Sequence, residues 1–141
     1  MREMSRDEWR AFLEAGTRTA KLAVVRRDGR PHVVPVWFLL DGDELLFSTW
    51  HTSVKGRALR RDGRLCLCVD EERPPYGYVM VEGTARLSAD PADRAAWSRR
   101  IAARYMGQDQ AEAFGARNDV EGELLFRVRL DHVVALAGIA D

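Results

Sequence analysis

Polar and cationic side chains gather over one short stretch of the sequence. In order, they are two hydroxyls, an indole, a further hydroxyl and two cations: Ser48, Thr49, Trp50, Ser53, Lys55 and Arg57. Hydroxyl and backbone donors together with a cation bind a phosphate group, and a flat apolar surface supports an aromatic ring. This spacing therefore predicts a site for a phosphorylated aromatic cofactor.

A helix that begins near Ser53 would add unpaired backbone N–H groups and the positive end of its dipole to that site. The same residues fit a simpler interpretation, in which Ser53 caps a solvated helix whose cations face water. Composition leaves both interpretations open. The position of these residues directly after a predicted β-hairpin favours the first.

The elements that must position this stretch are short strands joined by tight turns. Apolar and β-branched patterns predict six strands, over about 19–25, 32–40, 45–50, 65–69, 78–87 and 123–136. The pairs Asp28-Gly29 and Asp41-Gly42 supply the positive φ angles of two-residue hairpin turns. Two such turns in succession are typical of an antiparallel meander.

The second of these strands contains the run VVPVWFLL, which is nearly continuous in apolar residues. Such a strand is covered on both faces, by a barrel interior on one side and by a helix or a second subunit on the other. Pro35 has no N–H to donate, so pairing should lapse there and leave the backbone of Val36 and Trp37 available to a ligand. A proline on an exposed edge without any ligand is the open alternative.

Helices are predicted at the edges of the sheet. Ser5 and Glu8 form a capping box for a short N-terminal helix that ends at Gly16. Asp90-Pro91 begins the clearest helix, which ends at Gly107, and a weaker helical segment follows over about 110–117. We therefore predict a mainly β fold with peripheral helices, a closed or partly closed antiparallel barrel in a single domain over residues 1–141.

Charge and composition exclude several classes of protein. The 22 Lys and Arg residues balance 22 Asp and Glu residues, so the basic excess of a nucleic-acid-binding protein is absent. No apolar run approaches the roughly 20 residues of a membrane-spanning helix, and the charged N-terminus differs from a signal peptide, so we expect a cytoplasmic protein. Cys66 and Cys68, without further ligands nearby, are interpreted as small core residues, and no metal site is predicted.

An ordered series of residues resembles a known group. The stretch TAKLAVVRRDGRPHVVPVWFLLDGDELLFSTWHTSVKGRALRRDGRLCLCVDEERPPYGYVMVEGTARL, followed by RYMG, is similar to the pyridoxamine 5'-phosphate oxidase-like split β-barrels that bind FMN or the deazaflavin coenzyme F420, and most closely to their small F420-dependent branch. The similarity covers about 19–107 in detail and the last strand in pattern. It implies a six-stranded antiparallel split barrel, with an N-terminal helix and a helical insertion before the last strand, that forms a homodimer with the cofactor between the subunits.

The resemblance also implies roles for individual residues. The backbone of Pro35, Val36 and Trp37 would line the ring, while Ser48 and Thr49 approach the ribityl chain and the phosphate. Lys55 would be the phosphate cation, with Ser53 and Gly56 in the same turn and Trp50 and Arg57 beside it. Arg104 and Tyr105, in RYMG, would reach the site from one subunit or the other, the alternative being a core tyrosine and a solvated arginine.

Two departures from the family pattern limit the assignment. The corner helix of the family often reads K-x-R-N-L, whereas Ala58 stands here in place of the amide, which leaves the phosphate contacts less defined. The C-terminal substrate region of true pyridoxamine phosphate oxidases has no counterpart before Asp141. We therefore do not expect oxidation of vitamin B6.

The leading hypothesis is an oxidoreductase that uses reduced F420 to transfer hydride to a small conjugated or unsaturated substrate. When a cofactor carries the chemistry, the main role of the protein is to orient it. No catalytic residue is assigned, and His32 and His51 are candidate proton donors. One alternative is an FMN-binding oxidase or flavin reductase of the same fold, and another is a non-catalytic barrel that binds a cofactor or tetrapyrrole. A barrel that stacks single-stranded nucleic acid on Trp37 and Trp50 is disfavoured by the zero net charge.

Overall fold

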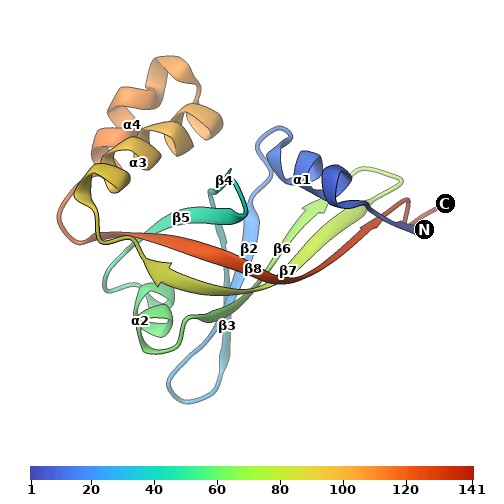
Figure 1. Cartoon of the computed structure of the whole chain (residues 1–141), viewed down its shortest axis with the longest axis horizontal. Helices are drawn as coiled ribbons and strands as arrows, with labels where there is room; N and C mark the ends of the chain where they lie inside the picture. The colour runs from blue at the N-terminus through green and yellow to red at the C-terminus, as the bar shows by residue number, and fades with distance from the viewer.

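Eight antiparallel strands form one strongly bent sheet in the computed structural model, which describes residues 1–141 (Figure 1). The strands are β1 (Arg2–Glu3), β2 (Ala20–Val25), β3 (Pro31–Val36), β4 (Leu39–Asp41), β5 (Glu44–Trp50), β6 (Arg64–Glu71), β7 (Gly77–Leu87) and β8 (Glu123–Ala137). Their order in the sheet is β3-β2-β6-β7-β8-β5-β4, and β1 pairs with β8. Because the outer strands β3 and β4 are not hydrogen-bonded to each other, the barrel is split, and the predicted mainly β fold is confirmed.

The structure has eight strands where six were predicted, because the predicted second strand is divided into β3 and β4 and because β1 was not predicted. The break falls at Trp37 and Phe38. Pro35 still pairs with Lys21, and β3 is an edge strand, so pairing does not lapse at the proline as predicted.

The turn at Asp28-Gly29 joins β2 to β3 at the predicted place. It is longer than two residues, because the Arg26 N–H donates to the Arg30 carbonyl at 2.9 Å, and of the pair only Gly29 has a positive φ, of +88°. The two-residue turn between β4 and β5 consists of Gly42 and Asp43, one residue later than predicted, because Asp41 still pairs with Glu44.

The predicted meander ends at β5. The second neighbour of β5 is β8, from the far end of the chain, and β6 pairs with β2 instead. The chain crosses between these two groups of strands through helix α2 (Val54–Arg61). The residues at the end of β5 therefore lie next to the first residues of β8, a neighbourhood that the local sequence pattern does not predict.

The remaining helices form where capping residues predict them. Helix α1 (Arg6–Glu14) begins after Ser5, whose Oγ accepts a hydrogen bond from the Glu8 N–H at 3.2 Å. Helix α3 (Pro91–Met106), a short 3-10 turn (Gln108–Gln110) and helix α4 (Ala111–Asn118) form the insertion before β8. Figure 1 shows α3 and α4 packed together at one end of the sheet, away from α1.

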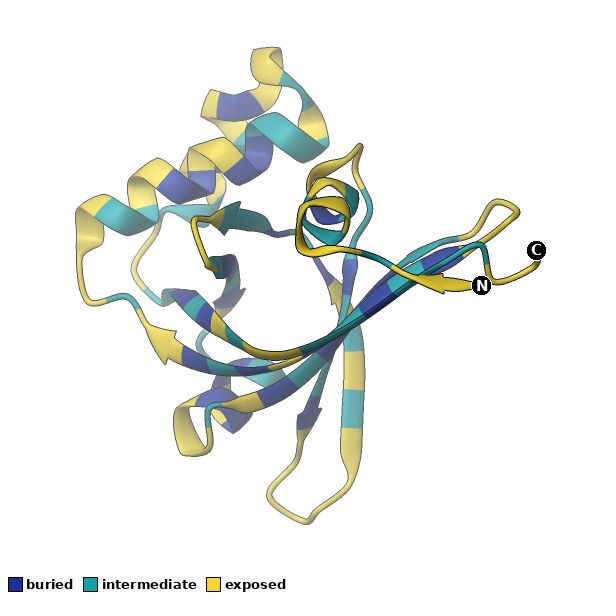
Figure 2. Ribbon diagram, turned by 45° about the vertical axis from the view of Figure 1, so that its right-hand side comes forward, coloured by how far each residue is buried: buried dark blue, intermediate teal, exposed yellow.

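The hydrophobic core lies inside the bent sheet. Burial alternates along the strands, as Figure 2 shows, and the rings of Phe47 and Phe126 stack in the interior with centroids 5.5 Å apart. On β6, Leu65 and Leu67 point into this core. Cys66 and Cys68 point to the opposite, outward face and are only half-buried, so the expectation that they are core residues is wrong.

Candidate functional site

Most of the elements that the sequence places near the predicted site line one small pocket. Its volume is about 270 Å³, and it lies where β3 and β5 end and where α2 and β8 begin. Five of its lining residues were predicted and three were not: Pro35, Val36, Trp37, Ser48 and Lys55, and then Ile101, Asn118 and Glu123. Lys55 and the end of β3 near Pro35 thus line the same cavity.

The turn before α2 positions Lys55. The Ser53 Oγ caps the helix by accepting a hydrogen bond from the Gly56 N–H at 3.0 Å, and it lies 2.8 Å from the Thr49 Oγ1 as a further hydrogen-bond partner. A Cβ added at Gly56 would lie 2.9 Å from the Trp50 carbonyl oxygen, so the close approach of α2 to β5 needs glycine there. Thr49, Ser53 and Gly56 therefore orient the helix and do not line the pocket.

Lys55 and Arg57 point to opposite sides of α2. Residues two positions apart on a helix differ by about 200° in direction. The inward face carries the buried Gly56, Ala58 and Leu59, and Lys55 lies among them, whereas Arg57 is exposed. The structure thus does not bring Arg57 together with Lys55.

Trp50 also lies outside the pocket. Its indole is 46% exposed and packs over Gly122, where an added Cβ would lie 2.7 Å from a ring carbon. The His51 ring is tilted against it at a centroid distance of 4.9 Å. A contact between Trp50 and a cofactor stays a prediction that the pocket geometry of a single chain does not support.

Lys55 is a cation without a partner. Its ammonium group makes no hydrogen bond or ion pair in the structure, although the side chain is half-buried. Burial lowers the pKa of Lys55, and the charge of Glu123 partly opposes that change. A partly desolvated ammonium beside the Ser48 hydroxyl gives the pocket the donor set that suits a phosphate.

Glu123 is the polar residue that sequence reasoning missed. It begins β8 opposite Trp50 and is half-buried at the pocket wall. Burial raises the pKa of Glu123, while the nearby Ser48 hydroxyl and the charges of Lys55 and Arg94 oppose the rise. Only the pairing of β5 with β8 places this carboxyl near Lys55, so the pocket carries both signs of charge.

Arg104 and Tyr105 hold the wall behind the pocket. Arg104 donates hydrogen bonds to the carbonyl oxygens of Leu13 at 2.7 Å, Phe38 at 2.8 Å and Gly16 at 3.0 Å. The Tyr105 ring stacks on Trp37 at a centroid distance of 5.1 Å. The alternative of a solvated Arg104 is wrong, and neither side chain lines the pocket in a single chain, so their contact with a cofactor stays a prediction.

The bonds of Arg104 predict a stability effect. We expect Arg104→Ala to lower the free energy of unfolding by about 3 kcal/mol, because three carbonyls, two of them at the C-terminal end of α1, lose a charged donor. Urea unfolding measures this loss. Arg99→Ala is the control, since Arg99 on the same helix is exposed and pairs only with exposed Glu112, and it should cost less than about 1 kcal/mol. Equal losses would contradict the assigned role.

The structure does not meet the requirements for a metal site or for a membrane-spanning helix. The structure contains no group of three or more His, Cys, Asp or Glu side chains arranged to hold a metal ion. None of its helices has the length and apolar character needed to cross a membrane.

Solved structures share this fold. A conserved hypothetical protein of Mycobacterium tuberculosis is 23% identical, with a TM-score of 0.84, over 96% of this chain and 86% of that chain. The haem storage protein HutZ of Vibrio cholerae is 16% identical, with a TM-score of 0.74, over 100% of both chains. At these identities the similarity shows the fold alone.

A third structure and a family model are more specific. A protein named F420 reductase is 26% identical, with a TM-score of 0.70, over 87% of this chain and 94% of that chain. The family model described as pyridoxamine 5'-phosphate oxidase matches residues 5–135, which is nearly the whole chain. The chain therefore belongs to the pyridoxamine 5'-phosphate oxidase family.

Proposed function

We propose that this protein is an oxidoreductase that binds coenzyme F420 beside Lys55 and reduces a small conjugated or unsaturated substrate. The observation that carries the proposal is the unpartnered Lys55 ammonium, in a side chain that lines one pocket together with Pro35, Val36 and Trp37. The similarity to a protein named F420 reductase supports the choice of cofactor. When bound, the reduced deazaflavin supplies the hydride.

The residues of the chain bind and orient the cofactor. Lys55 and the Ser48 hydroxyl would hold its phosphate, and the backbone of Val36 and Trp37 would border its ring. Tyr105 supports this wall by stacking behind Trp37, and its hydroxyl donates to the Arg18 carbonyl at 2.8 Å. Such positioning is what hydride transfer requires of a protein.

A titration with F420 and with FMN tests the proposal. Ring fluorescence or absorbance should report F420 binding at a Kd on the order of 10 µM or tighter. Turnover of reduced F420 with an unsaturated acceptor would establish the enzymatic role. Binding of FMN but not of F420 would show that FMN is the cofactor. Binding of either cofactor without turnover of any acceptor would indicate a binding protein. Binding of neither cofactor would overturn the proposal.

We further propose that a second copy of the chain completes the site. A pocket of about 270 Å³ is smaller than the roughly 300–1,000 Å³ of most ligand sites, so it accommodates only part of a flavin-like cofactor. Much of the outward face of the sheet beside it is apolar, and Lys21 and Glu82 lie on the same face. Register places Ala23 between Val33 and Cys66, and Met80 between Cys68 and Val134. Pro35, which lines the pocket, is on the same edge strand.

Light scattering tests the homodimer. We expect a mass of twice the 16.0 kDa chain mass at micromolar concentration. Val33→Asp, at a side chain that is 62% exposed on this face, should give monomers and weaken F420 binding by about tenfold, because a charge buried against the partner is costly. Leu87→Asp is the control, since Leu87 is 42% exposed near the far end of β7. A wild-type monomer would contradict the proposal.

A further inference from the structure

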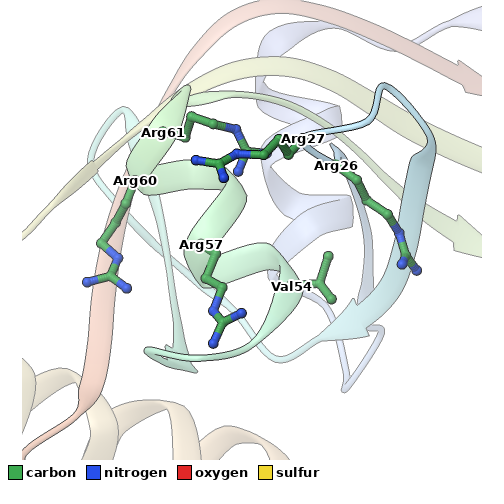
Figure 3. Close-up of a pocket in the computed structure, with 6 residues that line it drawn as sticks. All are labelled: Arg26, Arg27, Val54, Arg57, Arg60 and Arg61. Atoms are coloured by element: carbon green, nitrogen blue, oxygen red, sulfur yellow. The ribbon is translucent and has the colours of Figure 1, made fainter.

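A groove lined by arginines lies on the outward side of α2. It has a volume of about 660 Å³, and six residues line it: Arg26, Arg27, Val54, Arg57, Arg60 and Arg61. Figure 3 shows that two of the arginines come from the turn after β2 and three from α2. The groove is therefore built from two elements that are far apart in the sequence.

The charge of this groove is not neutralised within the chain. None of its five arginines forms an ion pair with a carboxylate. The neighbouring acids Asp28 and Asp62 pair with Arg30 and Arg64 instead. Since the whole chain has a net charge of zero, the concentration of positive charge is local to the groove. Like charges held together without partners oppose folding, and a bound anion would relieve that repulsion.

Two of the arginines are fixed in place by the backbone. Arg60 donates a hydrogen bond to the His51 carbonyl at 3.0 Å, and Arg61 donates one to the Val25 carbonyl at 3.1 Å. Each guanidinium keeps further N–H donors free, because it carries five. Because these contacts already order two of the side chains, binding an anion there costs less side-chain entropy.

The groove is separate from the pocket beside Lys55. Helix α2 lies between them, with Lys55 on its inward face and Arg57 on its outward face. The two sites share no lining residue. An anion in the groove would therefore leave the pocket accessible.

We propose that this groove binds a compact polyanion made of two or more linked phosphoryl groups. Guanidinium groups bind phosphate through paired N–H donors, and arginines from two elements line this groove, with Arg26 and Arg60 pointing to opposite sides of α2 in Figure 3. Val54 is the one apolar lining residue, and no aromatic side chain offers a platform for a base. Inorganic oligophosphate and the phosphate chain of a nucleotide share this chemistry.

Calorimetric titration at about 50 mM salt distinguishes these sources. We expect inorganic tripolyphosphate and ATP to bind with Kd values within about threefold of each other, because the groove offers no base contact. AMP and triglutamate should bind at least about tenfold more weakly, because their charges are fewer or more widely spaced. No tripolyphosphate binding at about 1 mM would overturn the proposal. Much tighter binding of ATP, or equal binding of triglutamate, would overturn the phosphate assignment.

Matched variants locate the site. The double variant Arg26→Gln, Arg27→Gln should weaken tripolyphosphate binding by about tenfold or more. The control Arg99→Gln, Arg117→Gln removes the same charge from exposed positions in the helical insertion and should change binding by less than about twofold. Lys55→Ala should also leave it within about twofold, whatever its effect on F420. If the control variant weakens tripolyphosphate binding equally, the anion is attracted by the overall positive charge and not by the groove, and the assigned site is overturned.

Discussion

Lys55→Ala is expected to weaken F420 binding by about 30-fold, which corresponds to about 2 kcal/mol. The ammonium group is half-buried, has no partner in the protein and lines the pocket beside Ser48. Charge-assisted hydrogen bonds to a phosphate contribute roughly 1.5–3 kcal/mol each, and alanine removes them without leaving another protein group unpaired. Fluorescence titration of wild-type and variant protein measures the change.

Arg57→Ala is the matched control for this experiment. It removes one positive charge from the same helix, but from the opposite, outward face. We expect its effect on F420 affinity to stay within about threefold. Equal losses in both variants would show that net charge on α2, and not the pocket, holds the cofactor. An unaffected Lys55→Ala variant would remove the pocket from the proposed function, even if the protein still bound F420.

Local sequence signals predicted much of this fold. Capping residues at Ser5, Ser53 and Asp90 mark the starts of three helices, and the structure has helices after each of them. The Asp-Gly pairs mark the places of two hairpin turns. These signals are reliable because each depends on a few neighbouring residues and on backbone geometry.

The content of the pocket was less predictable, because it depends on contacts between distant segments. Glu123 reaches the pocket only because β8 pairs with β5, and nothing near Glu123 in the sequence indicates that pairing. The resemblance places Arg104 in the site, whereas in the single chain its guanidinium binds three backbone carbonyls. Arg57 is close to Lys55 in the sequence, but the helical period from Ser53 onward places the two side chains on different faces of α2.

Glu123→Gln is expected to tighten F420 binding by about tenfold near pH 8 and to remove most of its dependence on pH. Glu123 is a half-buried carboxyl at the wall of a pocket in which we place an anion. Burial raises the pKa of Glu123, and a bound phosphate would raise that pKa further. Binding therefore takes up a proton, and wild-type affinity should rise as the pH falls from about 8 to about 5.

Other titrating groups contribute to the same curve, and the variant separates them. Lys55 from α2, Arg94 from α3 and the Ser48 hydroxyl from β5 act on the Glu123 carboxyl, and Arg94 also pairs with Asp119 at 2.8 Å. Burial lowers the pKa of Lys55, so loss of its charge at high pH weakens binding in the same direction. The ratio of wild-type to Glu123→Gln affinity at each pH cancels the contribution of the ligand. It cancels that of Lys55 except for the further lowering of the Lys55 pKa when the Glu123 charge is lost.

The stability of the free protein provides an independent test of the direction of the Glu123 pKa shift. A carboxyl whose pKa is raised in the folded state contributes stability at low pH that is lost as the pH rises through the folded-state value. Glu123→Gln should therefore raise the Tm at pH 7 and leave it little changed near pH 4. If the variant is more stable at pH 7 but binds F420 more weakly at every pH, the Glu123 carboxylate accepts hydrogen bonds from cofactor hydroxyls, and the phosphate lies farther from β8 than we propose.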